Sequence, residues 1–234
     1  MQITYAGQAG FIFETDDGVR IGSDLYLSDC CYRYFGFKRL LPYVFKADEL
    51  DLDILISTHA HYDHFDPDSV PVIMSNRKTR FVCAYDVRAE AERLNLEQNR
   101  ITYLKEGDTA EIKGAKIKAV ACDHGKDTPD AIGVLLTLSG KKIYIAGDTA
   151  FREDYFANSE LHNADLLIIP INGAFGNMDE TEGVRAAEIL NAKLTVPSHY
   201  WCFAEHGGNP DIFAKNAEGK FNYLLMRPGE TFEI

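Results

Sequence analysis

The sequence has no long apolar run and no recognisable leader segment. No stretch approaches the roughly 20 apolar residues that a membrane-spanning helix needs. The first five residues have neither the basic start nor the apolar core of a signal peptide. The five cysteines are odd in number and show no Cys-x-x-Cys spacing, which argues against a disulfide framework. We therefore expect a reduced, cytoplasmic protein without a membrane partner.

Basic charge is also scarce. Lys and Arg number 24 against 36 Asp and Glu, for a formal net charge of −12. A nucleic-acid partner is not expected, because phosphate contacts depend on Lys and Arg. An anionic small-molecule substrate stays compatible, since a bound metal ion can reverse the sign of the local field. No linker, repeat or low-complexity tract divides the chain, so we expect a single domain over residues 1–234.

Histidine, by contrast, is concentrated in one stretch. His59, His61, Asp63 and His64 fall within six residues, directly after the apolar run 53–56. Their spacing fits neither one face of a helix nor the alternation of a strand, which indicates a loop at the end of a buried strand. Imidazole with carboxylate is the ligand set of open catalytic zinc, manganese or iron sites. We interpret this stretch as a metal site.

Three later residues also follow predicted strands: His124, Asp148 and His199. Taken alone, each is more often a hydrogen-bonded loop or turn residue than a ligand. Their joint occurrence at strand ends makes the set much more specific, because a rigid sheet fixes the loops that carry a site.

Together these seven residues resemble the signature of the metallo-β-lactamase superfamily, His-x-His-x-Asp-His at 59–64 followed in order by the three later ligands. The resemblance implies an α/β (α+β) fold, a four-layer αβ/βα sandwich with the site at one edge of two sheets. It also implies a ligand assignment. One ion would be held by His59, His61 and His124, and a second by Asp63, His64 and His199, with Asp148 bridging them. Two divalent ions per chain are expected, Zn²⁺ or Mn²⁺, with Fe²⁺ also compatible.

Within that superfamily, residues 7–11, 177–187 and 197–200 look like the branch of ascorbate-6-phosphate lactonases. This resemblance implies a hydrolase that opens a lactone or ester of a small anionic molecule such as a sugar phosphate. A metal-bound water ionises near neutral pH and supplies the attacking hydroxide. Asp63 is placed to orient that water or to pass a proton to the leaving group.

Substrate contacts are expected mainly from the residues after His199. Trp201, His206 and Asn209 follow that ligand, and Asn172 follows the apolar strand at 165–170. His206 is a candidate catalytic residue that binds a substrate anion or donates a proton; a loop hydrogen bond is the competing interpretation.

The segment 23–46 is crowded with aromatic residues at irregular spacing. It is interpreted as an arm over the site, as a contact surface for a second copy in a homo-oligomer, or as a satellite hydrophobic cluster. Its Arg33, Lys38 and Arg39 form either a phosphate clamp or a solvated basic patch.

Three other functions compete with lactone hydrolysis. The first is a metal-dependent phosphodiesterase acting on a small nucleotide or a lipid headgroup. The second is a metal-binding protein without catalysis, which the intact ligand set disfavours. The third is an iron-dependent redox protein; redox members of the superfamily resemble a variant with glutamate where this chain has His61, and no flavin-binding segment is visible.

Hydrophobic periodicity and turn residues predict the remaining elements. Strands are expected at 3–5, 10–14, 19–22, 53–57, 80–84, 101–104, 109–112, 115–122, 132–138, 142–146, 165–170 and 193–196, with two more near the C-terminus. Helices are expected at 66–74, 86–94, 179–191 and 210–217.

Overall fold

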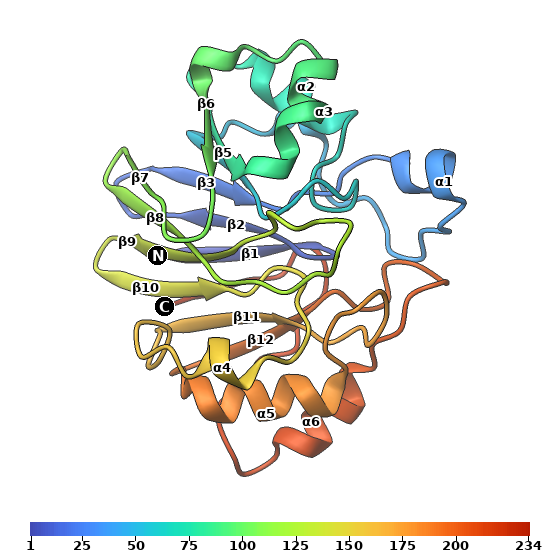
Figure 1. The fold of residues 1–234 in the computed structure, drawn as a ribbon, viewed down its shortest axis with the longest axis vertical. Helices are drawn as coiled ribbons and strands as arrows, with labels where there is room; N and C mark the ends of the chain where they lie inside the picture. The colour runs from blue at the N-terminus through green and yellow to red at the C-terminus, as the bar shows by residue number, and fades with distance from the viewer.

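Two β-sheets lie face to face between outer layers of helices in the computed structural model, which describes residues 1–234 (Figure 1). The first sheet has the order β13-β1-β2-β3-β4-β5-β6 and the second the order β12-β11-β10-β9-β8-β7. The strands of the first sheet are β1 Gln2–Gly7, β2 Gly10–Glu14, β3 Arg20–Ser23, β4 Ile54–Ser57, β5 Arg80–Ala84, β6 Ile101–Leu104 and β13 Thr231–Glu233. Those of the second are β7 Thr109–Ile112, β8 Ala115–Val120, β9 Gly133–Leu138, β10 Lys141–Ile145, β11 Leu166–Pro170 and β12 Thr195–Ser198.

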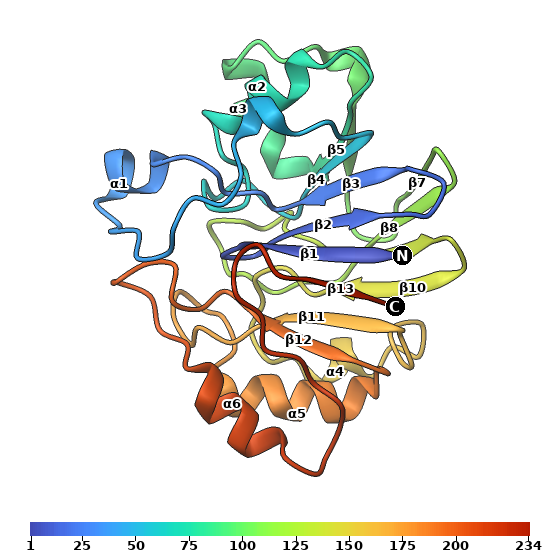
Figure 2. The same cartoon turned by 180° about the vertical axis from the view of Figure 1, so that it is seen from behind.

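The helices divide between the two outer faces. α2 Ser69–Ser75 and α3 Arg88–Arg93 lie beside the first sheet. α4 Glu153–Phe156, α5 Glu180–Leu190 and α6 Pro210–Ala217 lie beside the second. α1 Cys30–Phe35 stands apart at one edge of the sandwich. From behind, β13 lies next to β1, and the two chain ends are neighbours (Figure 2). This is the four-layer αβ/βα sandwich that the sequence predicts.

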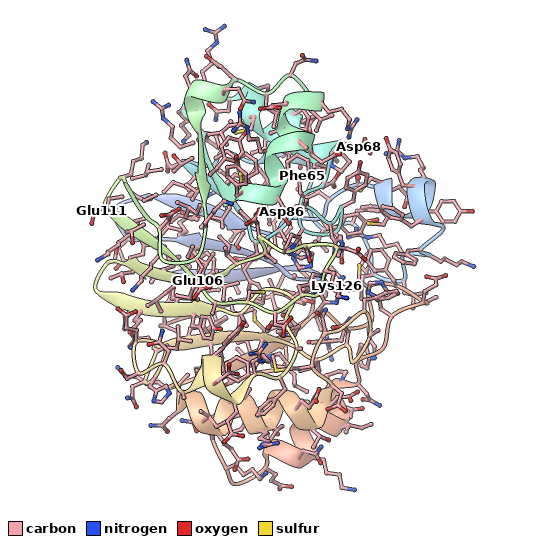
Figure 3. The ribbon with its side chains drawn as sticks, in the orientation of Figure 1. Phe65, Asp68, Asp86, Glu106, Glu111 and Lys126 are labelled. Atoms are coloured by element: carbon pink, nitrogen blue, oxygen red, sulfur yellow. The ribbon has the colours of Figure 1, made fainter.

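Alternating side chains explain the layers. In β10 and β11, Ile143 and Ile168 face the first sheet and join the central core, whereas Tyr144 and Leu167 pack toward α5. Strands buried on both faces read as continuous apolar runs, as in β4 and β11. Phe65, labelled in Figure 3, extends the central core beyond β4 by packing against Phe81 with 6.0 Å between ring centroids.

Most expected elements occur within a few residues of their predicted bounds, with two departures. Only one of the two strands expected near the C-terminus forms, because Tyr223 makes just an isolated bridge with Thr195. The helix expected at 86–94 divides into a 3₁₀ turn, Tyr85–Val87, and α3. Two further 3₁₀ turns span Ala47–Glu49 and Gln98–Arg100. None of the helices has the length and apolar character required to cross a membrane.

The aromatic arm at 23–46 holds α1 but is otherwise irregular. Its inner side chains, Tyr26, Cys30 and Cys31, form a small buried cluster with Cys202 and Phe203 of the C-terminal half. Backbone hydrogen bonds join the same two segments, for example Leu40 N–H to the Cys202 carbonyl at 2.7 Å. The arm is therefore fixed beside the loop that follows β12.

Candidate metal centre

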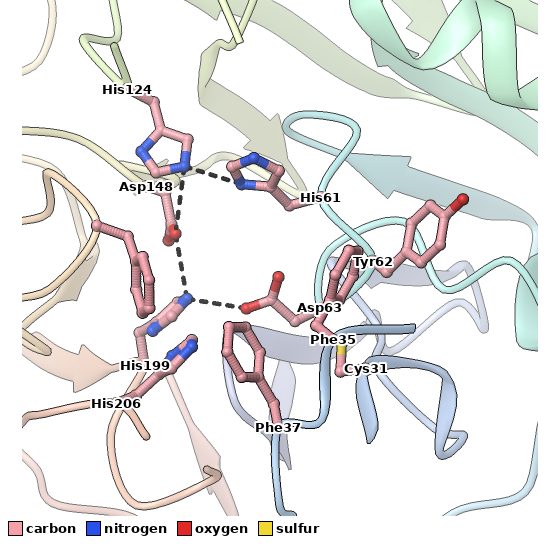
Figure 4. Close-up of a pocket in the computed structure, with 11 residues that line it drawn as sticks. Cys31, Phe35, Phe37, His61, Tyr62, Asp63, His124, Asp148, His199 and His206 are labelled. Atoms are coloured by element: carbon pink, nitrogen blue, oxygen red, sulfur yellow. Dashed lines mark hydrogen bonds and ion pairs between the residues drawn. The ribbon is translucent and has the colours of Figure 1, made fainter. Parts of the chain in front are cut away.

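The seven expected ligands lie on loops that directly follow strands. β4 delivers His59 to His64, while β8, β10 and β12 lead to His124, Asp148 and His199. These strand ends meet at one edge of the sandwich, so side chains from both sheets converge there (Figure 4). The convergence follows from topology, since each of these strands runs toward the same edge before its loop begins.

Three imidazoles form one group of potential ligands. Nδ1 of His61 lies 3.0 Å from Nε2 of His59 and 3.0 Å from Nε2 of His124. Asp63, His64 and His199 form a second group, in which Oδ2 of Asp63 lies 3.2 Å from Nε2 of His199. Within each group, the donor atoms lie within 4.8 Å of one another.

Asp148 lies between the two groups. Its Oδ1 is 3.2 Å from Nε2 of His64, and its Oδ2 is 3.1 Å from Nε2 of His199. The same Oδ2 is 3.8 Å from Nε2 of His124, which belongs to the first group. One carboxylate thus reaches toward both sets of donors, as a bridging ligand must.

Unpaired buried atoms provide a test of whether the site fits metal ions. Nε2 of His64 and Oδ1 of Asp148 are both buried and lie 3.2 Å from each other, but neither atom makes a hydrogen bond of normal geometry. A divalent cation bound to both atoms would give each of them a partner. The donor set of imidazole and carboxylate also suits zinc, manganese or iron. The residues fit two divalent ions.

The charges of the site favour the ligand forms of His59 and of the two carboxylates. Burial, with the neighbouring His64, holds the pKa of His59 well below its usual range, so this imidazole is neutral. Burial opposes ionisation of Asp148, but His199 and His64 outweigh it and hold the pKa of that carboxyl well below its usual range. Asp63 behaves in the same way, mainly through His64. Neutral imidazole and ionised carboxylate are the forms that bind metals. The neighbouring Asp148 and Asp63 outweigh burial and raise the pKa of His64 well above its usual range and the pKa of His199 to about 9, so a bound metal must displace a proton from each of these two ligands.

Two supporting residues were not predicted from the sequence. Asp24 is fully buried, accepts hydrogen bonds from Thr58 N–H and Oγ1, and lies 3.2 Å from Nδ1 of His64. Gln8 sits in the turn between β1 and β2 with φ of 55°. Its side-chain Nε2 donates to Oδ2 of Asp63 at 2.8 Å, and its backbone carbonyl accepts the backbone N–H of His199. Such contacts orient ligands and tune a metal site. The family-like motif at residues 7–11 could have drawn attention to Gln8, whereas nothing in the sequence singles out Asp24.

A cavity of about 210 Å³ opens onto the donors. Of the expected substrate residues, only His206 lines it. The His206 ring stacks parallel to that of His199, with 5.5 Å between centroids, and neither of its ring nitrogens has a hydrogen-bond partner. Burial lowers the pKa of His206 to about 4, with His199 adding to the shift. The residues around the cavity are Cys31, Phe35, Phe37, His61, Tyr62, Asp63, His124, Asp148, Phe175, His199 and His206.

The other three expected substrate residues lie outside this cavity. Asn172 is buried against its own loop, where it bonds Ala174 and Asn177, and Gly207 passes so closely over its carbonyl that a Cβ there would clash. Trp201 is half exposed and lines a different surface hollow. Asn209 caps the start of α6 by accepting the Asp211 N–H. Closeness in sequence to a ligand did not place these side chains at the site.

The basic residues of the arm also lie outside the cavity. Arg33 pairs with Asp68 on the outer surface. The Arg39 guanidinium lies over the rings of Tyr26 and Tyr43. Lys38 is exposed to solvent. The structure therefore shows no phosphate clamp at the cavity.

Comparison with known proteins gives the family. The profile described as the beta-lactamase superfamily domain matches residues 25–200. The chain belongs to this superfamily. A UPF0173 metal-dependent hydrolase of Thermococcus onnurineus is 31% identical to it, over 89% of this chain and 98% of the relative. The chain is accordingly a metal-dependent hydrolase of the superfamily.

Solved structures agree on the fold. Igni18, described as a metallo hydrolase from Ignicoccus hospitalis, aligns with a TM-score of 0.78 and 25% identity, covering 100% of this chain and 98% of that one. CmlA, a diiron β-hydroxylase from Streptomyces venezuelae, aligns with a TM-score of 0.75 over 100% of this chain and 54% of its own. At 13% identity the CmlA match concerns the fold alone.

Proposed function

We propose that this hydrolase opens a lactone or a related ester of a small molecule, with two divalent ions, Zn²⁺ or Mn²⁺, as cofactors. Ring opening adds one water across the acyl C–O bond and yields a hydroxy acid. The observation that carries the proposal is the pair of donor groups that share Asp148 at the floor of a small cavity.

The seven ligand residues would hold the ions in two groups, His59, His61 and His124 in one and Asp63, His64 and His199 in the other, with Asp148 between them. When bound, such ions supply Lewis acidity and lower the pKa of a water molecule from about 15.7 to about 7.

Two residues of the chain act directly on the substrate in this proposal. The Asp63 side chain is 13% exposed, lines the cavity, and is held by the Gln8 amide, so it orients the attacking water or passes a proton to the leaving oxygen. His206 is neutral at pH 7 because of its lowered pKa; its ring nitrogens are unpaired but buried, so they hydrogen-bond the substrate only after the surrounding rings move.

The charge of the cavity favours a carbonyl substrate over a phosphodiester. Asp63 and Asp148 line it, and no Lys or Arg does. A phosphodiester keeps its negative charge throughout hydrolysis and gains from side-chain cations such as an arginine clamp. A lactone or ester is neutral before attack and needs no such partner.

Metal content and hydrolysis together test the proposal. Protein purified without chelator should carry about two divalent ions per chain and hydrolyse a simple lactone, but not bis(p-nitrophenyl) phosphate. His124→Ala should lose bound metal and activity together. His162→Ala is the matched control, because the His162 side chain lies outside the site and bonds only the Phe156 carbonyl. Phosphodiester cleavage without lactone opening would overturn the proposal.

A further inference from the structure

Three phenylalanines form an apolar wall at the mouth of the cavity. Phe35 ends α1, Phe37 follows it in the arm, and Phe175 comes from the loop after β11. Ring centroids lie 5.9 Å apart for Phe35 and Phe37, both labelled in Figure 4, and 5.7 Å apart for Phe37 and Phe175. Segments well separated in the sequence thus contribute one continuous aromatic surface, hereafter the aromatic wall.

The outer members of the aromatic wall are not core residues. Phe35 is 55% exposed and Phe175 is 59% exposed, whereas Phe37 is half-buried and packs on Phe203. Phenylalanine is usually buried, and contiguous exposed apolar surface commonly marks a binding site. Here that surface borders the cavity that contains the metal-binding donors.

From these contacts we infer the substrate class: an uncharged lactone or ester whose non-reacting part is a compact apolar group, an aromatic ring or a branched alkyl chain, seated against the aromatic wall. The inference rests on the proposed function and makes its substrate specific. A charged substituent seated against the aromatic wall, away from the metal-binding donors, would be desolvated without a partner, because no Lys or Arg lines the cavity.

Size limits the apolar group. The cavity measures about 210 Å³. An apolar protein cavity of about 150 Å³ holds one benzene molecule. The cavity can therefore hold one ring with the ester group beside it. It is too small to enclose a long acyl chain.

Five-membered lactones of matched chemistry test this specificity: unsubstituted, phenyl-substituted and carboxymethyl-substituted. Wild-type kcat/KM should be at least about 10-fold higher for the phenyl than for the carboxymethyl compound, the scale of discrimination by an apolar pocket.

In the double variant F35A/F175A, kcat/KM should fall about 10-fold or more for the phenyl compound and change little for the unsubstituted one. Both residues are exposed, so the variant should fold. Tyr32→Ala is the control, since Tyr32 is equally exposed on α1 but does not line the cavity.

A binding measurement separates this inference from the hydrolysis itself. In protein loaded with Zn²⁺, benzyl alcohol should shift the backbone amide NMR signals of Phe35, Phe37 and Phe175. F35A/F175A should weaken benzyl alcohol binding at least several-fold, and Tyr32→Ala should leave it unchanged. Equal rates on the phenyl and carboxymethyl lactones, or an unchanged preference in the double variant, would overturn the inference and leave the proposed function standing. Benzyl alcohol binding at the wall with no lactone opened would overturn the proposed function alone.

Discussion

Gln8 is the single residue whose position most directly affects the candidate metal centre without being a metal ligand. Its amide donates to Asp63, and its carbonyl fixes the backbone of His199, so it touches two members of the second donor group. Gln8→Ala should lower turnover, or the affinity for the ion held by the second donor group, by about 10–100-fold. This is the usual effect of removing a hydrogen-bond partner of a metal ligand. Competition with a coloured chelator and steady-state kinetics measure the two quantities.

Gln2 supplies the matched control for this prediction. It lies on β1, the strand that leads into the Gln8 turn, and its side chain is exposed and bonds only Glu233. Gln2→Ala should leave metal affinity and kcat within twofold of wild type. Wild-type metal affinity and kcat in Gln8→Ala, with both variants folded by circular dichroism, would show that Gln8 does not orient the ligands.

Predictability from sequence differs sharply among residues of the site. The stretch 59–64 could be recognised because its side chains are adjacent in sequence and of one chemical kind. Asp24 and Phe175 could not, because nothing near them in sequence shows that folding brings them to His64 or to the cavity. Trp201 shows the converse, since it is close to a ligand in sequence and remote from the cavity in space.

Among the elements, α5 illustrates how local chemistry defines a helix. Asp179 accepts the N–H groups of Thr181 and Glu182, and the Glu182 carboxylate bonds the Asp179 N–H, forming a capping box. Asp179→Ala should lower the free energy of unfolding by about 1 kcal/mol, the usual value of such a cap. Urea denaturation measures the change. Glu188→Ala, which removes only an exposed pair with Lys220, should cost less. Equal losses would mean that the cap contributes nothing specific.

The arm and the C-terminal segment show where element prediction stops. α5 could be predicted because its acidic first turn and apolar spacing lie within one stretch. The arm instead gains its shape from contacts with residues 202–206, more than 160 positions away, as in the bond from Lys38 N–H to Glu205. The segment around Tyr223 has strand-like composition but only one short bridge with β12. Long-range contacts determine the conformation of the arm and the strand pairing of the Tyr223 segment, and the local sequence does not encode those contacts.

At the scale of the whole molecule, the metal centre joins the two sheets. The loop after β4 in the first sheet carries four donors, and strands β8, β10 and β12 of the second lead to three. Metal removal should therefore lower global stability. Ions present at about 1,000 times their dissociation constant contribute about 4 kcal/mol per site, so EDTA should lower the Tm by about 10 °C or more in scanning calorimetry. His124→Ala, which removes a donor of the first group and leaves the second group intact, should lose less Tm to EDTA than the wild type does. A Tm that chelator leaves unchanged in the wild type would contradict this prediction.

Asp53 makes a second connection between the sheets, independent of metal. It precedes β4, accepts the Arg20 N–H at 2.9 Å, and pairs with Lys113 of the β7–β8 turn at 2.7 Å. Burial raises the pKa of Asp53, but the bonds from Lys113 and Arg20 outweigh it and leave the pKa below its ordinary value. A carboxyl whose folded pKa is depressed stabilises the fold above its unfolded pKa, about 3.9, and loses that contribution as pH falls through the folded pKa.

In chelator-treated protein, Asp53→Asn should cost about 1–3 kcal/mol at pH 7 by urea denaturation, the value of hydrogen bonds to a charged group. That cost should shrink as pH falls below about 4. Asp51→Asn, at an exposed carboxyl paired with Lys78, should cost less than about 1 kcal/mol at either pH. A cost for Asp53→Asn that stays constant with pH would show that its charge does not hold the sheets together.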